Sequence, residues 1–152
     1  MGHAFHQLYY HFAWSTHSRI AVLRRDLRPK LLMIINDEAK KSGGWPIRHN
    51  AMPDHVHLLV RLPPTVTVSE FIGRVKGATS HRFNEEIRPN CPIQWQEGYG
   101  VVSLRKGEVE KVSRYIDKQE THHRLGKLSD LLERTEGDED QADAQIPSPK
   151  GG

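Results

Sequence analysis

Two histidines one residue apart, His55 and His57, have the spacing in this chain that most clearly indicates metal chemistry. They lie in residues 52–60 (MPDHVHLLV), which read as a strand that follows a tight Pro-Asp turn. Strand side chains alternate between two faces, so both imidazoles share one face and leave Val56 and Leu58 on the other. Two imidazoles leave coordination positions for a further ligand, water and substrate oxygens. A divalent cation held in this way can polarise a phosphate as a Lewis acid.

A downstream tyrosine, Tyr115, could supply a nucleophile for such a site. Apolar residues recur every three or four positions over residues 108–121 and predict a helix. On that helix Gln119 shares a face with Tyr115, which fits a nucleophile beside a third metal ligand and equally fits an ordinary side-chain pair. A phenol with a pKa near ~10 is almost entirely protonated at neutral pH, so its attack on a phosphodiester needs a metal or a base. A phosphotyrosine keeps the energy of the diester, so a later 3′-hydroxyl can displace it without ATP.

The elements expected to position these residues alternate in type along the chain. The order strand–helix–strand–strand–helix–strand–helix is typical of a ferredoxin-like split βαβ fold. We therefore predict an α+β protein with an antiparallel sheet and helices on one face. The strands are expected at residues 7–15, 45–51, 56–61, 93–99 and 101–104, and the helices at residues 28–42, 69–87 and 108–121.

Charge divides the chain of 152 residues into two parts. The net charge of +3 combines +8 over residues 1–128 with −5 over residues 129–152. We predict one domain at 1–128, followed by an acidic, disordered tail at 129–152. Residues 135–152 have too little apolar surface to fold, whereas residues 127–133 are compatible with a further helical turn or two. A basic body fits a polyanionic partner such as nucleic acid, and it also fits a plain solvated surface.

Other sequence features narrow the class of protein. The single cysteine, Cys91, rules out an internal disulfide and a multi-cysteine zinc site. No run approaches the ~20 apolar residues that span a bilayer, and the first residues do not read as a signal peptide. We therefore expect a cytoplasmic protein without a membrane partner.

Four motifs make the chain resemble a known family, the single-tyrosine HUH transposases of insertion sequences, which move elements as single-stranded DNA. The resemblance runs from about residue 10 to about residue 124. The first and last motifs, in this order and separation, are the most specific. The motifs are residues 52–60 (MPDHVHLLV), 71–80 (FIGRVKGATS), 95–100 (WQEGYG) and 115–119 (YIDKQ).

The resemblance implies a set of roles. His55, His57 and Gln119 would hold the cation, and Tyr115 would become linked to a DNA 5′-phosphate. The activity would be cleavage and rejoining of single-stranded DNA at hairpin-flanked element ends. Imidazole ligands favour Mn²⁺ over the harder Mg²⁺, whereas cellular abundance favours Mg²⁺, so either ion is expected.

The resemblance also implies an assembly. The protein would be a homodimer with sheets joined edge to edge, and the tyrosine helix of one subunit can complete the metal site of the other. Many relatives continue after the position of Arg124 with a further helix that packs on the body. Here the acidic tail follows instead.

Basic residues, together with one tryptophan for base stacking, are the candidates for a DNA surface. Each basic residue taken alone also fits an ordinary surface charge. Two other functions remain open: a hairpin-DNA-binding protein that does not cleave, and a metallohydrolase for a small phosphorylated substrate, which would leave the basic body without a role. The candidate DNA residues are Arg48, Arg74, Lys76, Arg82, Arg105, Lys106 and Trp95.

Overall fold

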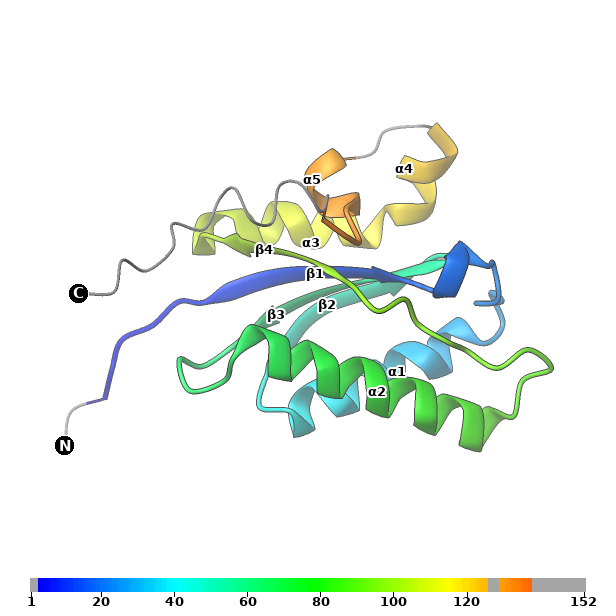
Figure 1. Ribbon diagram of the computed structural model, residues 1–152. Helices are drawn as coiled ribbons and strands as arrows, with labels where there is room; N and C mark the ends of the chain where they lie inside the picture. Colours follow the sequence, from blue (N-terminus) through cyan, green and yellow to red (C-terminus); the bar gives the residue numbers. More distant parts are fainter. Residues whose placement is uncertain (1–2, 126–128, 138–152) are drawn as a thin grey trace.

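The computed structural model describes residues 3–125 and 129–137, and within them four strands form one antiparallel sheet in the order β2-β3-β1-β4 (Figure 1). Every pairing between neighbouring strands is antiparallel, which confirms the predicted fold class. Because β3 lies between β2 and β1, the histidine pair stands on a strand that is paired on both sides. The strands are β1 (Tyr9–Ser15), β2 (Trp45–Ala51), β3 (His55–Arg61) and β4 (Gly100–Leu104).

Helices cover both faces of the sheet: α1 and α2 lie on one face, and α3, α4 and α5 lie on the other (Figure 1). The prediction that all helices lie on one face is therefore wrong. The reason is that both faces carry apolar side chains that must be buried. Phe12 and Leu58 pack beneath α1 and α2, whereas Leu59 packs against Val112 and Ile116 on the opposite side. The helices are α1 (Arg28–Lys41), α2 (Val68–Ile87), α3 (Val109–Asp117), α4 (Gln119–Leu125) and α5 (Asp130–Glu133), with short 3-10 turns η1 (His17–Arg19) and η2 (Lys106–Glu108).

The ends of α1 and α2 follow from their local sequences. Pro29 lies in the first turn of α1, where its missing N–H costs no hydrogen bond. Gly43, just after α1, has a φ of 93°, a conformation that favours glycine. Thr67 caps α2, because its side chain accepts a hydrogen bond from the backbone N–H of Glu70.

The predicted strand at residues 93–99 is wrong. Only Trp95 forms a β-bridge there, an isolated one to Thr16. The side-chain amine of Lys76 on α2 donates to three successive carbonyls, beginning with that of Gln96, over 2.7 to 3.2 Å. A lysine thus satisfies the carbonyl groups that a neighbouring strand would otherwise pair with.

Residues 129–137 belong to the predicted disordered tail, but they fold back onto the sheet. Within them α5 lies where a further helical turn was compatible with the sequence, and it contacts β1 and β4. Leu132 and Thr135 are buried. At Gly100 a Cβ atom would lie 1.7 Å from the carbonyl oxygen of Arg134, so this glycine allows the backbone to pass. The acidic composition of the tail hides these few packing residues. The rest of the predicted tail, residues 138–152, lies outside the described residues.

The predicted helix at 108–121 is two helices, α3 and α4, which meet at Lys118. This break directs α4 away from the axis of α3 (Figure 1). The ring centroid of His123 on α4 lies 5.0 Å from that of His55 on β3. None of the helices within residues 3–125 and 129–137 combines the length and the apolar character needed to cross a bilayer.

Candidate metal and tyrosine site

The two histidines of β3 lie side by side on the face covered by α3, α4 and α5. The side chain of His55 is 2% exposed and that of His57 is 0% exposed. Val56 and Leu58, the residues between and after them, are buried against α1 and α2. The predicted division of this strand between two faces is therefore confirmed.

The inner ring nitrogens of both histidines are engaged by neighbouring side chains. Nδ1 of His55 lies 2.7 Å from Asp54 Oδ1, and since a carboxylate only accepts hydrogen bonds, Nδ1 carries the proton. Nδ1 of His57 lies 2.9 Å from Nε2 of His11, which is diagonal to it on β1. These contacts fix the ring orientations and leave Nε2 of each histidine facing the centre of the cluster.

His11 is held in its neutral form. Burial, and then the neighbouring His57, lower the pKa of His11 to about 3. Burial also lowers the pKa of His57. At neutral pH both rings are therefore uncharged, and His57 can bind a cation without first losing a proton.

The carboxylate of Glu133, on α5, lies directly in front of these two histidines. Its Oε2 atom is 3.3 Å from Nε2 of His55 and 3.2 Å from Nε2 of His57. Its Oε1 atom lies 3.5 Å from Nε2 of His123 on α4. One ligand atom from each of these four residues lies within 4.8 Å of the other three.

The hydroxyl of Tyr115 reaches the same carboxylate. It donates to Glu133 Oε1 over 2.8 Å and accepts a hydrogen bond from the backbone N–H of Ser129 over 3.0 Å. Its ring stacks on His122 at a centroid distance of 4.6 Å. Burial raises the pKa of Tyr115, and the negative charge of Glu133 raises it further. The tyrosine is therefore protonated and fully hydrogen-bonded in this state.

The carboxylate of Glu133 is ionised. Burial alone would raise its pKa, but the contacts with His55 and His57 and the hydroxyl of Tyr115 outweigh that effect. The pKa of Glu133 therefore lies well below its usual range. A negative charge stands where the two histidines and the tyrosine meet.

Gln119, the predicted third ligand, is buried at the start of α4. Its side-chain nitrogen donates to the carbonyl of Tyr115 over 3.3 Å, and its Oε1 lies 3.1 Å from Nε2 of His123. The structure thus places Gln119 beside His123, at the border of the cluster. Its role as a metal ligand remains a prediction.

The residues present fit a divalent cation. Nε2 of His55 and Nε2 of His57 are buried and have no hydrogen-bond partner among the described residues, although both face a carboxylate oxygen. Three imidazoles and one carboxylate are ligands that Mn²⁺, Co²⁺ and Zn²⁺ accept. A cation between them would compensate the charge of Glu133 and engage both unpartnered nitrogens.

Three of the predicted DNA-binding residues make contacts within the fold. Lys76 is buried and holds the segment after α2. Arg82 Nη1 lies 2.8 Å from Glu38 Oε1 and so joins α2 to α1. Trp95 is only 9% exposed and packs edge-on against Trp14, which prevents it from stacking on a base. These contacts within the fold account for all three side chains, and a role of any of them in DNA binding remains a prediction.

The other predicted DNA-binding residues lie at the surface. Arg48 forms an exposed ion pair with Asp117 over 3.3 Å. Arg74, Arg105 and Lys106 are exposed. For these four residues DNA contact remains a prediction.

Two arginines beside the cluster were missed by sequence reasoning. Arg19 lies 3.4 Å from Asp54, the partner of His55. Arg25 forms an ion pair with Glu120, which follows Gln119 in α4. The charge of each residue alone gave no indication of this proximity, which arises from the path of the chain between β1 and α1.

His123 and Glu133 were also missed. For His123 a signal existed, because it stands four residues after Gln119 and so shares its helix face. For Glu133 there was none, since it belongs to the acidic tail, where neither spacing nor composition links it to the histidines.

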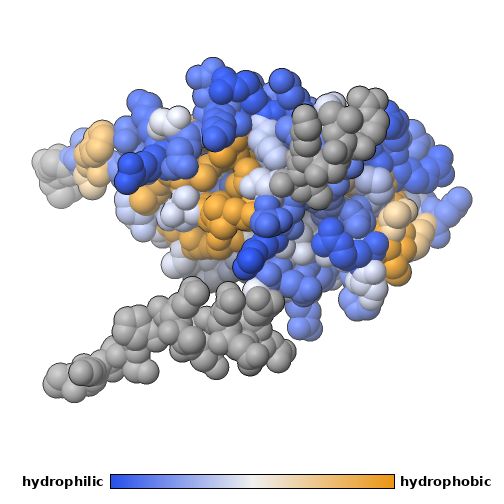
Figure 2. Space-filling model, turned by 90° about the horizontal axis from the view of Figure 1, so that it is seen from above, coloured by the Kyte–Doolittle hydropathy of each residue, from blue (hydrophilic) through white to orange (hydrophobic). Residues whose placement is uncertain are grey.

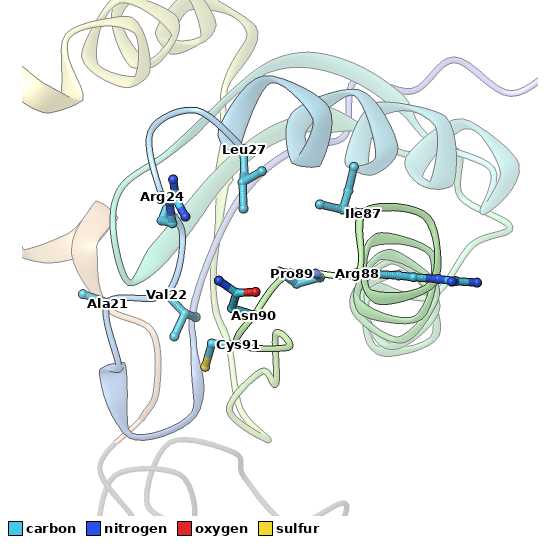
Figure 3. A pocket seen from close by; sticks show the side chains of 9 residues that line it. All are labelled: Ala21, Val22, Arg24, Leu27, Ile87, Arg88, Pro89, Asn90 and Cys91. Carbon is cyan, nitrogen blue, oxygen red and sulfur yellow. The ribbon is translucent and has the colours of Figure 1, made fainter.

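Two cavities within the described residues differ in their relation to the site: one borders Tyr115 and the other lies apart from the cluster. One of about 370 Å³ lies between β4, α3 and α5 and is bordered by Tyr115, Ser129 and Leu131. This cavity lies on the face of the sheet that α3, α4 and α5 cover. Figure 2 views the molecule from that side and shows a patch of apolar side chains surrounded by hydrophilic ones. Another, of about 360 Å³, lies between the β1–α1 connection and the loop after α2, where Ile87 and Cys91 line it (Figure 3). It shares no lining residue with the histidine cluster.

Comparison with known proteins gives a consistent result. A family model described as "Transposase IS200 like" matches residues 4–119. The ISDra2 transposase TnpA of Deinococcus radiodurans is 28% identical over 120 residues, which cover 75% of this chain and 85% of that protein. The transposase of insertion sequence IS200 from Salmonella typhimurium is 30% identical over 79 residues, which cover 49% of this chain and 51% of that protein.

Solved structures agree with these sequence matches. The crystal structure of a candidate transposase from Deinococcus radiodurans R1 superposes with a TM-score of 0.61 at 25% identity, covering 78% of this chain and 96% of the other. A REP-associated tyrosine transposase bound to a REP hairpin has a TM-score of 0.56 at 16% identity, covering 84% and 76%. The second similarity shows the shared fold.

Proposed function

The chain belongs to the IS200-like transposase family, and on that premise we propose that it cleaves and rejoins single-stranded DNA through a covalent link between Tyr115 and a 5′-phosphate. One observation carries the proposal. The hydroxyl of Tyr115 and Nε2 of both His55 and His57 contact the same carboxylate, that of Glu133, although they come from distant segments. A group bound at that point would meet the nucleophile and the metal ligands together.

The proposed chemistry assigns a part to each residue. The phenolic oxygen of Tyr115 forms a bond to phosphorus as the bond from phosphorus to the 3′-oxygen breaks, and the phenolic proton passes to solvent or to the departing oxygen. A divalent cation, Mg²⁺ or Mn²⁺, supplies Lewis acidity toward the phosphate when it is bound. His55 and His57 would hold it, with Gln119 as the proposed third ligand. Asp54 and His11 keep the two imidazoles oriented.

The proposed substrate is hairpin-forming single-stranded DNA. A structural relative was solved with a REP hairpin, which supports a folded nucleic acid as partner. The +8 charge of residues 1–128 favours polyanions. Arg74, Arg105 and Lys106 are the exposed residues we assign to phosphate contact.

The homodimer remains a proposal as well. Its sheets would join through an outer strand, β2 or β4. In this structure one chain brings Tyr115, His55 and His57 together, so the arrangement does not require the tyrosine helix of a second subunit. We therefore propose that each subunit of such a dimer can hold its own site.

A second candidate function is binding of hairpin DNA without cleavage. The observation that favours it is the closed state of the site, in which Glu133 and the N–H of Ser129 occupy both hydrogen-bonding roles of the Tyr115 hydroxyl. A chain locked in this state would bind DNA through its basic surface alone.

A denaturing gel separates the two functions. Wild-type protein is incubated with labelled hairpin DNA in Mn²⁺, and with EDTA in a parallel sample. We expect a denaturation-resistant protein–DNA band in Mn²⁺ only, and its loss in Tyr115→Phe, whose DNA affinity should stay near that of the wild type. Cleaved DNA that persists with Tyr115→Phe would show a water nucleophile, and uncleaved DNA with wild-type protein would favour the binding function.

A further inference from the structure

Glu133 lies beyond the part of the chain that matches the family model, which ends at residue 119. It is nevertheless the residue that contacts every other member of the cluster: His55, His57, His123 and Tyr115. The segment that supplies it therefore lies outside the matched part of the chain. The side chain of Glu133 is 14% exposed, so it is an interior group of the site.

The spacing of the ligand atoms suits a shared ion. Two ligand atoms that each lie about 2.1 Å from one cation stand about 3.0 to 3.4 Å apart at octahedral or tetrahedral angles. Oε2 of Glu133 is 3.3 Å from Nε2 of His55 and 3.2 Å from Nε2 of His57. Neither nitrogen has a hydrogen bond of good geometry within the described residues, and both distances fit the spacing of two ligands on one ion.

The position of Glu133 is fixed by the packing of its own segment. Leu132 is buried with Val112 and Ile116 of α3. Thr135 is buried and accepts a hydrogen bond from Arg19. The missing side chain of Gly100 makes room for the backbone that follows Glu133. The carboxylate is therefore held in place from both sides.

We propose, building on the proposed function above, that Glu133 is a ligand of the cation in the DNA-free protein and yields its place to a phosphate oxygen when DNA binds. A carboxylate and a phosphodiester each present two oxygens and one negative charge. Oε1 accepts a hydrogen bond from the Tyr115 hydroxyl over 2.8 Å, so the carboxylate fills the space next to the nucleophile that an attacked phosphate would need. The C-terminal segment thus closes the site from within the same chain.

Binding of Mn²⁺ alone, followed by electron paramagnetic resonance of the unbound ion, tests the ligand role. The variants are Glu133→Gln and a matched control, Glu136→Gln, which removes the same charge from an exposed position in the same segment. We expect Glu133→Gln to weaken Mn²⁺ binding about tenfold or more, and Glu136→Gln to bind as the wild type does. Equal Mn²⁺ affinity in all three proteins would overturn the ligand role.

DNA affinity tests the displacement. In Mn²⁺, Glu133→Gln should bind hairpin DNA several-fold more tightly than Glu136→Gln, because no carboxylate competes with the phosphate. In EDTA the difference between the two variants should shrink. Equal affinities in Mn²⁺ would overturn the exchange of carboxylate for phosphate.

A further variant separates this inference from the proposed function. If the His55→Ala/His57→Ala protein binds Mn²⁺ as well as the wild type does, the metal site itself, and with it the proposed function, is wrong. If that variant loses Mn²⁺ but Glu133→Gln keeps it, only the role of Glu133 is wrong. The rise in Tm caused by Mn²⁺, measured against the metal-free Tm of each variant, accounts for any change in folding.

Discussion

The hydroxyl of Tyr115 donates a hydrogen bond to Glu133 over 2.8 Å, and through this bond the tyrosine helix α3 is joined to the segment that follows α4. The same carboxylate faces His55 and His57 on the central strand β3. The proposed nucleophile, the two proposed metal ligands and the acidic side chain thus meet at one point in one chain. The following predictions depend on that geometry.

Replacing Asp54 by Asn should weaken the metal site without unfolding the protein. Asp54 accepts a hydrogen bond from Nδ1 of His55 and so directs Nε2 toward the cluster. Loss of such an orienting carboxylate typically lowers metal affinity by about 10- to 100-fold. Titration with Mn²⁺ measures the effect, and Asp117→Asn, at an exposed ion pair with Arg48, is the matched control. Identical affinities for the two variants would contradict the orienting role of Asp54.

Replacing Gly100 by Ala should displace the backbone around Arg134, which passes next to Gly100. The new Cβ would meet the carbonyl of Arg134 at 1.7 Å, and a backbone atom cannot move aside as a flexible side chain can. We expect a lower free energy of unfolding and weaker Mn²⁺ binding, because Glu133 precedes that carbonyl by one residue. Gly107→Ala, where a Cβ would meet nothing within 4 Å, is the control for the loss of a glycine. Wild-type Mn²⁺ affinity in Gly100→Ala would argue against the contribution of Glu133.

Two basic residues on α2 should separate stability from DNA binding. Lys76→Met removes a buried amine that donates to three carbonyls, which should lower the free energy of unfolding by about 2 kcal/mol.

Arg74→Met, at an exposed position, should leave stability unchanged. If Arg74 contacts a phosphate, its loss lowers DNA affinity and reduces the salt dependence of binding by about one unit of slope. Urea unfolding and DNA titrations over a range of salt concentrations measure the two effects. Weaker DNA binding with unchanged stability in Lys76→Met, together with lower stability in Arg74→Met, would instead identify Lys76 as the DNA contact.

The stability of the protein should depend on pH through His11. In the unfolded chain His11 takes up a proton near pH 6.5, whereas burial beside His57 delays this in the folded protein to about pH 3. Between these values the unfolded state binds more protons, so stability is lost as the pH falls. His11→Gln keeps a hydrogen-bonding side chain next to His57 without titrating. As the pH falls below 6.5, the free energy of unfolding of His11→Gln should decrease less steeply than that of the wild type. The two slopes should differ by up to about 1.4 kcal/mol per pH unit. Parallel curves for the two proteins would show that His11 is not held neutral.

The central part of the site could be predicted from the sequence because its residues obey local periodicities. His55 and His57 share a strand face at a spacing of two residues, and the apolar residues around Tyr115 indicate a helix. These patterns depend on backbone geometry, which short segments determine largely by themselves. The structure accordingly places both histidines on one face and Tyr115 on α3.

The remainder of the site depends on tertiary contacts that no local pattern encodes. Glu133 is positioned by Leu132, Thr135 and the space above Gly100, whereas the composition of its segment predicts disorder. Lys76 reads as a basic surface residue, although it satisfies carbonyls of a segment that lies twenty residues later in the chain. In both cases a partner distant in sequence decides what the side chain does.

Mass spectrometry of the covalent product tests the central claim most directly. Wild-type protein is incubated with hairpin DNA and Mn²⁺, digested with nuclease and trypsin, and searched for peptides that carry a nucleotide. Trypsin releases residues 115–118 (YIDK), in which Tyr115 is the only tyrosine. We predict a nucleotide linked through its 5′-phosphate on this peptide, absent in EDTA and in His55→Ala/His57→Ala. Cleaved DNA with no modified peptide, or a nucleotide on a different tyrosine, would contradict the account.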